Sequence, residues 1–212
     1  MPIKLRLFLL GVLMACNFVT HANEQKKMPQ QCLSDCKTPY GQELGATKDG
    51  IKAYSNCQSS CVIFEPNHYK KVYTGIKWQC VEYARRWLLT KHGVVYGDVD
   101  YAYNIWDKIK TLKSPKEFPK KELALKNIIN GEIKDFRVGD LIIYGKEFLT
   151  TGHIAVVIEY NEKESWIKVA EENYANTKWP GNYARRIPLQ NIKNKLTIDD
   201  QFVLGIKRIV YP

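Results

Sequence analysis

The chain has 212 residues, of which 45% are hydrophobic, 12% aromatic and 25% charged. This mixture excludes a disordered, coiled-coil or collagen-like chain and leaves room for one globular domain. Lys and Arg number 32 against 22 Asp and Glu, a formal charge of +10. The basic residues are not interleaved with aromatics along a stripe, so we expect no nucleic-acid partner.

Residues 1–22 have the pattern of a secretory signal peptide. Lys4 and Arg6 form a positive start, and an apolar stretch from Leu7 to Ala15 follows. That stretch is too short to span a bilayer, so we expect no membrane span. Cleavage after Ala22 is the expected processing, and a lipid anchor on Cys16, at the end of a lipoprotein-like box, is the alternative. Either route predicts a secreted or periplasmic protein.

Residues 23–38 are polar and without period, and are interpreted as an arm that precedes a domain over residues 39–212. Two cysteine pairs have CxxxC spacing: Cys32 with Cys36, and Cys57 with Cys61. In an oxidising compartment these favour two disulfides, with three connectivities open. We expect crossing pairs that join the two motifs, because they would tie the arm to the domain. Structural zinc sites use closer spacing, so we expect no metal.

The first half of the chain predicts one short strand and two helices. The strand covers residues 51–54, where apolar and polar residues alternate weakly. Val81, Ala84 and Leu88 recur at helical spacing, which predicts a helix over residues 79–92 that ends before Gly93. A second helix is predicted over residues 101–109, and a Lys- and Pro-rich mobile surface loop over residues 110–121.

The second half predicts strands. They cover residues 141–144, 153–160, 166–171 and 205–211, and the middle two should form an antiparallel hairpin. A helix-rich half followed by a strand-rich half predicts an α+β fold, with the helix that carries Cys80 packed on an antiparallel sheet.

Cys80 is the cysteine left over from the two pairs. On the first turn of a helix it faces the positive end of the helix dipole and unpaired backbone N–H groups, which favour the thiolate. It is therefore a candidate nucleophile. The alternative is a small buried thiol without chemistry.

The predicted hairpin places His153 beside acidic and amide side chains. With a five-residue turn over residues 161–165, His153 lies opposite Asn173 and diagonal to Glu171; with a three-residue turn it lies opposite Glu171. In both registers the three side chains share one face of the sheet. Such a neighbour fixes the imidazole ring and leaves its other nitrogen free to take a proton from a thiol.

Four motifs in order carry a family resemblance. They are GIKWQCVEYARR at residues 75–86, GDLIIY at 139–144, TGHIAVV at 151–157 and AEEN at 170–173. They resemble the CHAP (cysteine, histidine-dependent amidohydrolase/peptidase) domains, above all the amidase domains of bifunctional glutathionylspermidine synthetase/amidases. The resemblance begins at about Pro39 and runs to the end of the chain.

The resemblance implies a papain-like fold and a cysteine amidohydrolase without a cofactor. Cys80 becomes the nucleophile, His153 the general base and then acid, and Glu171 the residue that orients His153. Gln79 would complete the oxyanion hole, with a helix cap as its alternative role. Asn173 becomes a supporting polar residue.

Two substrate classes follow from the same resemblance. Arg85 matches the family's glutathione-binding arginine, which suggests contact with a substrate carboxylate; a surface charge is the alternative. The expected substrate is a small peptide–polyamine conjugate, and a peptidoglycan stem peptide is the rival, favoured by export. A non-enzymatic binding module is a third hypothesis. No phosphate-binding loop follows the domain, so we expect no synthetase activity.

Overall fold

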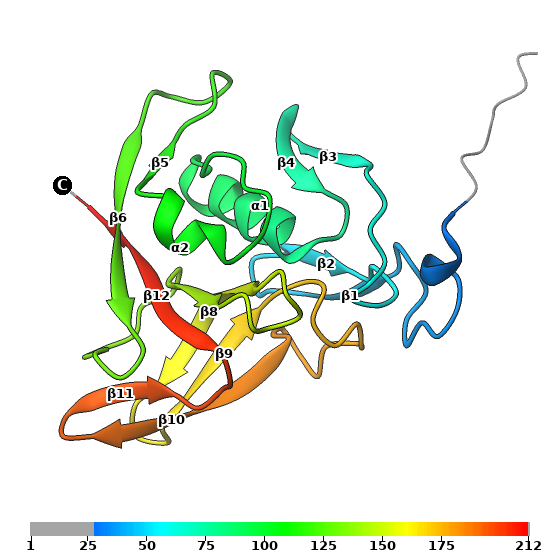
Figure 1. The fold of residues 1–212 in the computed structure, drawn as a ribbon. Helices are drawn as coiled ribbons and strands as arrows, with labels where there is room; N and C mark the ends of the chain where they lie inside the picture. Colours follow the sequence, from blue (N-terminus) through cyan, green and yellow to red (C-terminus); the bar gives the residue numbers. More distant parts are fainter. Residues whose placement is uncertain (1–27, 212) are drawn as a thin grey trace, which may run out of the picture.

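The computed structural model describes residues 28–211 (Figure 1). The predicted signal peptide and the alternative anchor at Cys16 lie outside the described residues. Within them, no helix is long and apolar enough to cross a membrane.

The described residues form a short 3-10 turn, two α-helices and twelve strands. The turn is η1 (Gln30–Cys32), and the helices are α1 (Cys80–His92) and α2 (Asn104–Lys108). The first six strands are β1 (Glu43–Ala46), β2 (Lys52–Tyr54), β3 (Pro66–Tyr69), β4 (Val72–Ile76), β5 (Thr111–Lys113) and β6 (Glu122–Ile129). The other six are β7 (Leu141–Tyr144), β8 (His153–Asn161), β9 (Trp166–Ala170), β10 (Arg185–Ile192), β11 (Lys195–Ile198) and β12 (Val203–Val210).

Eight strands make one antiparallel sheet in the order β11-β10-β9-β8-β7-β12-β6-β5, while β1–β2 and β3–β4 form separate two-stranded sheets. Figure 1 shows α1 over the large sheet, and it contacts both β8 and β4. Few helices on a predominantly antiparallel sheet confirm the predicted α+β class.

The central strands are apolar on both faces because both faces are covered. In β7, Leu141 and Ile143 join the core cluster that includes α1, whereas Ile142 and Tyr144 point into a second cluster on the other face. This division follows from the period of two in a strand. The sequences of the buried strands β7 and β8 are therefore largely apolar and do not alternate with polar residues.

Helix α1 agrees with the prediction to within one residue. Gln79 is its extended N-cap, and Gly93 ends it in the left-handed region at φ 68°, where its N–H bonds to the carbonyl of Leu89. Gly93 suits this place because it lacks the Cβ that the left-handed region penalises.

The predicted β8–β9 hairpin is present with a small change of turn. Asn161 pairs with Trp166, so the turn is one residue shorter than the longer alternative. A bulge between Val157 and Glu159 compensates, and Val156 pairs with Ala170. At the end that carries His153, the register is therefore the one that sets His153 diagonal to Glu171.

Two predictions in the middle of the chain need correction, and several strands along the chain were not predicted. The second helix is only α2, five residues long. The expected loop over residues 110–121 contains β5, which pairs with β6. Strands β1, β3, β4, β6, β10 and β11 were not predicted, because they are short or carry charged residues on an exposed face, as in the exposed-buried alternation of β6.

Two disulfides fasten the arm to the domain. Cys32 bonds to Cys61 and Cys36 bonds to Cys57, which leaves Cys80 as the free cysteine of the described residues. Each bond joins one CxxxC motif to the other, as expected, but the pairs are nested and do not cross. Two disulfides are typical of an oxidising environment.

Candidate active site

The fold brings three side chains from distant elements together. Cys80 begins α1, His153 begins β8, and Glu171 directly follows β9. All three are buried, with exposed fractions of 8%, 1% and 3%. The His153 Nε2 lies 2.8 Å from Oε2 of Glu171. Because Nε2 is engaged there, Nδ1 is the ring nitrogen left for the thiol.

The charge balance around His153 favours its protonated form. Burial alone would lower the pKa of His153, but the charge of Cys80 and hydrogen bonds to Cys80 and Glu171 raise it to about 9. His153 is therefore suited to be an imidazolium beside Cys80.

Glu171 is held ionised by a second partner, Arg185 on β10. The Arg185 Nε donates a 2.5 Å hydrogen bond to Oε1 of Glu171, and Nη1 bonds to Asp200. Burial would raise the pKa of Glu171, but the charge of Arg185 and the bond to His153 hold it below its ordinary value. Arg185 Nη2 also donates a 3.3 Å hydrogen bond to Oε2, the oxygen that contacts His153, so Glu171 bridges His153 and Arg185.

Gly152 allows the chain to enter β8 at this place. It has φ 66°, and a Cβ added there would lie 2.7 Å from the Tyr144 carbonyl oxygen and 2.8 Å from the Tyr103 nitrogen. Both the left-handed backbone and the close approach require glycine. The Gly-His pair of the sequence motif is therefore a backbone requirement next to a functional side chain.

Three aromatic rings surround the His153 imidazole. The ring centroids of Tyr144, Phe148 and Tyr174 lie 5.3, 5.7 and 5.3 Å from it. Arg185 lies 3.7 Å from the centroid of Tyr174 and also bonds to the Tyr144 hydroxyl. The rings restrict the imidazole and limit the access of water to its bond with Glu171.

Gln79 is fixed by two hydrogen bonds beside Cys80. The Asn173 Nδ2 donates a 2.6 Å bond to the Gln79 carbonyl oxygen, and the Gln79 Nε2 donates a 3.2 Å bond to the Cys61 carbonyl. An amide nitrogen carries two hydrogens, so one remains for a ligand. Asn173 has φ 56°, a left-handed conformation that Asn tolerates.

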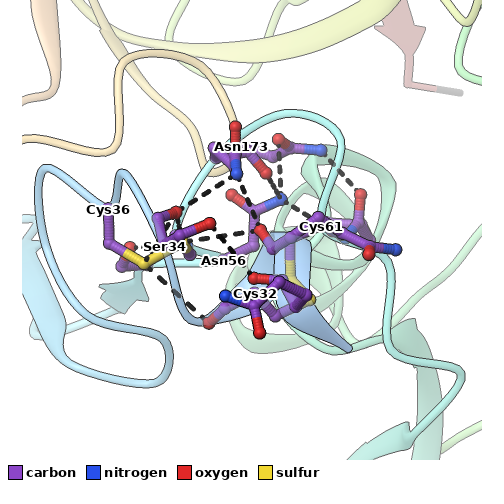
Figure 2. Close-up of a disulfide and its surroundings, with 12 residues drawn as sticks. Cys32, Ser34, Cys36, Asn56, Cys61 and Asn173 are labelled. Atoms are coloured by element: carbon purple, nitrogen blue, oxygen red, sulfur yellow. Dashed lines mark hydrogen bonds between the residues drawn. A yellow bond between two sulfur atoms is a disulfide. The ribbon is translucent and has the colours of Figure 1, made fainter. Parts of the chain in front are cut away.

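Asn56 links this pair to the disulfide-bonded segment. Its Nδ2 donates to Oδ1 of Asn173 at 2.8 Å and to the Cys61 carbonyl at 3.2 Å. Figure 2 shows Asn56 between the segment that contains Cys61 and Asn173. The Gln79 amide is thus placed by groups that the Cys32–Cys61 disulfide holds.

Arg85 does not join the other predicted site residues. It is buried on α1, its Nη1 bonds to Asp98, and its guanidinium lies over the rings of Tyr73 and Tyr96. It lines a cavity that includes neither Cys80 nor His153. The step of five residues from Cys80 to Arg85 turns the helix by a net angle of roughly 140°, which is why the two side chains diverge.

Sequence reasoning missed Arg185, Tyr174 and Asn56. Arg185 reaches the site because β10 pairs with β9, with Arg185 opposite Val169. In the sequence, Arg185 is marked only by its place in the pair Arg185-Arg186 after a polar segment, and such basic pairs are common on protein surfaces. Asn56 lies between a strand and a cysteine motif and carries no signal of its own.

Comparison with known proteins identifies a family for about half of the chain. Residues 71–173, which include Cys80, His153 and Glu171, match the CHAP domain family. These residues form a CHAP domain.

Relatives extend the similarity beyond the CHAP domain. A trypanothione synthetase of Crithidia fasciculata is 32% identical over 77% of this chain, and a bifunctional glutathionylspermidine synthetase/amidase of Escherichia coli (strain K12) is 32% identical over 79%. The matched parts cover 24% and 29% of those proteins. The chain therefore spans less than a third of the length of these relatives.

Proposed function

We propose that the protein is an exported cysteine amidohydrolase that cleaves an amide bond through Cys80, His153 and Glu171. The CHAP domain and the relative named as an amidase support a hydrolase that acts on amides. The observation that carries the proposal is a buried imidazole that interacts with a thiol at a helix start and bonds to a carboxylate.

The first half of the reaction forms a thioester. The Cys80 thiolate attacks the amide carbonyl carbon, and the electron pair of the C=O bond moves to oxygen. The intermediate then collapses, the C–N bond breaks, and the His153 imidazolium gives its proton to the departing amine.

The second half of the reaction hydrolyses the thioester and regenerates the free enzyme. Neutral His153 takes a proton from water as the water oxygen attacks the thioester carbonyl. Collapse of this second intermediate breaks the C–S bond, releases a carboxylic acid and restores the thiolate beside the imidazolium. Glu171 stays ionised throughout, holding the ring and compensating its positive charge.

The negative oxygen of both intermediates needs fixed donors. The Cys80 backbone N–H has no partner within α1, as for every residue in the first turn of a helix. The free hydrogen of the Gln79 amide supplies the second donor, and Asn173 and Cys61 fix its direction. Removal of one such donor typically lowers kcat by about 10²- to 10³-fold.

The substrate we propose is a small peptide–polyamine amide, as in the name of the glutathionylspermidine synthetase/amidase relative. The pattern of residues 1–22 and the two disulfides support export, which keeps a peptidoglycan stem peptide as the second candidate.

The test is a mass-spectrometric time course with glutathionylspermidine and with purified peptidoglycan fragments. Release of glutathione and spermidine supports the first candidate, and release of cleaved stem peptides supports the second. Cys80→Ala and Cys80→Ser should abolish turnover of either substrate while the melting temperature stays close to that of the wild type. Undiminished turnover in these variants would overturn the role of Cys80.

A further inference from the structure

A small cavity lies between β2, β3 and α1, three elements that Figure 1 labels. Its volume is about 270 Å³, just below the range of roughly 300–1,000 Å³ typical of small-ligand sites, so it suits a ligand of a single ring. None of the three proposed catalytic side chains lines it. Trp78, two residues before Cys80, is the wall residue that lies nearest to Cys80 in the chain.

Aromatic rings form much of the wall of this cavity. Tyr54 of β2 and Trp78 contact each other, with ring centroids 4.3 Å apart and planes tilted by 35°, so they make one continuous apolar surface. His68 and Tyr69 of β3 contribute two further rings. Flat faces of this kind pack well against a ring-shaped ligand.

The Asp, Lys and Arg side chains of the wall are already paired. Each has a partner of opposite charge within 2.9 Å: Asp49 with Lys91, Lys52 with Glu43, and Arg86 with Glu82 and Glu172. An anionic ligand would have to displace a carboxylate from Lys52 or Arg86. A cationic ligand would have to displace Lys91 from Asp49. The cavity therefore favours a ligand without charge.

Arg86 leaves one buried donor for such a ligand. A guanidinium has five N–H groups. Four of those on Arg86 donate to the protein: Nε and Nη2 to Glu82, Nη2 also to Glu172, and Nη1 to the Lys52 carbonyl. The second N–H of Nη1 has no partner among the described residues. Because the side chain is only 7% exposed, a ligand oxygen would satisfy a donor that is largely shielded from water.

Asn67 of β3 adds an acceptor to the same wall. Its Nδ2 donates a 2.8 Å hydrogen bond to Glu82, which leaves the Asn67 Oδ1 available on the other side of the amide. The cavity thus combines aromatic faces with a free donor and a free acceptor, and carries no unpaired carboxylate, lysine or full guanidinium charge.

We propose that this cavity binds a neutral sugar ring. The C–H groups on one face of a pyranose pack against an aromatic ring, and its hydroxyls both donate and accept hydrogen bonds. A hydroxyl can therefore accept from Arg86 and donate to Asn67. A flat aromatic ligand would match the rings of the wall but would leave these two polar groups unpaired.

The inference goes beyond the proposed amidase function, because it concerns binding and needs no turnover. Peptidoglycan attaches its stem peptides to N-acetylated sugars, so a sugar site suits the second substrate candidate better than the first. N-acetylglucosamine is accordingly the first probe of the cavity.

The test is saturation-transfer difference NMR of the purified protein, titrated with N-acetylglucosamine, glucose, glucosamine and glucuronate. The two neutral sugars should bind with millimolar affinity. Cationic glucosamine and anionic glucuronate should bind about tenfold more weakly, because every ion pair of the wall would oppose them. Cys80→Ala should bind the neutral sugars as the wild type does.

Two variants test whether the sugar occupies this cavity. Tyr69→Ala removes an aromatic face and should weaken binding of N-acetylglucosamine about tenfold, whereas Tyr69→Phe keeps the face and should retain the affinity. Thr90→Phe fills the cavity from α1 and should abolish binding. The control is Tyr160→Ala on β8, whose side chain is 45% exposed, and it should leave binding unchanged. Melting temperatures show which variants are folded.

Three results would overturn the proposal. The first is that neither neutral sugar binds the wild type at up to tens of millimolar. The second is wild-type affinity in folded Tyr69→Ala or Thr90→Phe, which would place the sugar elsewhere. The third is tighter binding of glucosamine or of glucuronate, which would make the cavity an aromatic cage for a cation or an anion site. A protein that hydrolyses no amide could still bind the sugar, so the two proposals fail separately.

Discussion

The Asn173 side chain donates a 2.6 Å hydrogen bond to the carbonyl oxygen of the Gln79 side chain. Asn173 follows the acidic pair at the end of β9, and Gln79 precedes α1, so this bond joins the strand-rich half to the start of the helix. It orients the Gln79 amide that we propose as an oxyanion donor.

Replacement of Asn173 by Gly should lower kcat by about tenfold, because Gln79 loses its partner while one backbone donor remains. Glycine keeps the left-handed backbone at this position, so the melting temperature should change little. The matched control is Asn194→Gly, an exposed Asn with φ 62° in the β10–β11 turn. A kcat equal to that of the control would show that Asn173 does not position Gln79.

The pH dependence of kcat/KM should change when the charge on Glu171 is removed. His153, with a pKa of about 9, must be protonated to donate to the leaving amine, so kcat/KM should fall as the pH rises through about 9. Glu171→Gln removes one of the influences that raise the pKa of His153, and the alkaline limb should move to lower pH. Glu147→Gln, an exposed substitution, should leave the limb in place. The same limb in both variants would contradict the role of Glu171.

The His153 pKa also predicts a dependence of stability on pH. Its folded-state pKa exceeds the ordinary value of 6.5, so the protonated form stabilises the fold. This contribution is complete below about pH 6.5 and is lost as the pH rises through about 9. His153→Gln should abolish it, measured as the difference in melting temperature from the wild type between pH 6 and pH 9.5. A constant difference across that range would argue against the raised pKa.

Arg185 is a positioning residue that acts through Glu171. Arg185→Gln would remove one of the two cationic partners of the buried Glu171 carboxylate and raise its pKa. The acid limb of kcat/KM, where protonation of Glu171 lowers activity, should then move to higher pH. Loss of one partner of a buried pair costs about 3–5 kcal/mol of stability, so the melting temperature should fall as well. Arg185→Lys should partly restore the acid limb, a rescue that a purely structural role would not give. The neighbouring Arg186→Gln is the control, since that side chain is half exposed.

The two disulfides should differ in their effect on activity. Each closes a loop of 21 to 29 residues, and its loss should cost about 3 kcal/mol of stability. Only Cys61 also accepts a hydrogen bond from Gln79. Cys32→Ser/Cys61→Ser should therefore lower kcat and melting temperature, whereas Cys36→Ser/Cys57→Ser should mainly lower the melting temperature. Equal values of kcat in the two double variants would indicate that both disulfides act only on stability.

Local patterns in the sequence determined the helix and the hairpin of the site. In each of them, the apolar residues recur at the period of the element. Helical periodicity followed by Gly93 located α1 and put Cys80 on its first turn, because backbone hydrogen bonds there join neighbours in the chain. Two β-branched runs around a polar turn located the β8–β9 hairpin. Strand alternation then put His153 and Glu171 on one face in either register, so the uncertain turn length did not matter.

The tertiary structure alone decided which side chains complete the site. Arg185 reaches Glu171 through the pairing of β10 with β9, and Asn56 reaches Asn173 through a loop held by disulfides. The cavity around Arg85 is built from β4, α1 and β5, which no local pattern connects. Such contacts join residues far apart in the chain, and their geometry depends on the packing of whole elements. The sequence therefore determined the helix and the hairpin that carry the three central residues, and the packing determined what surrounds them.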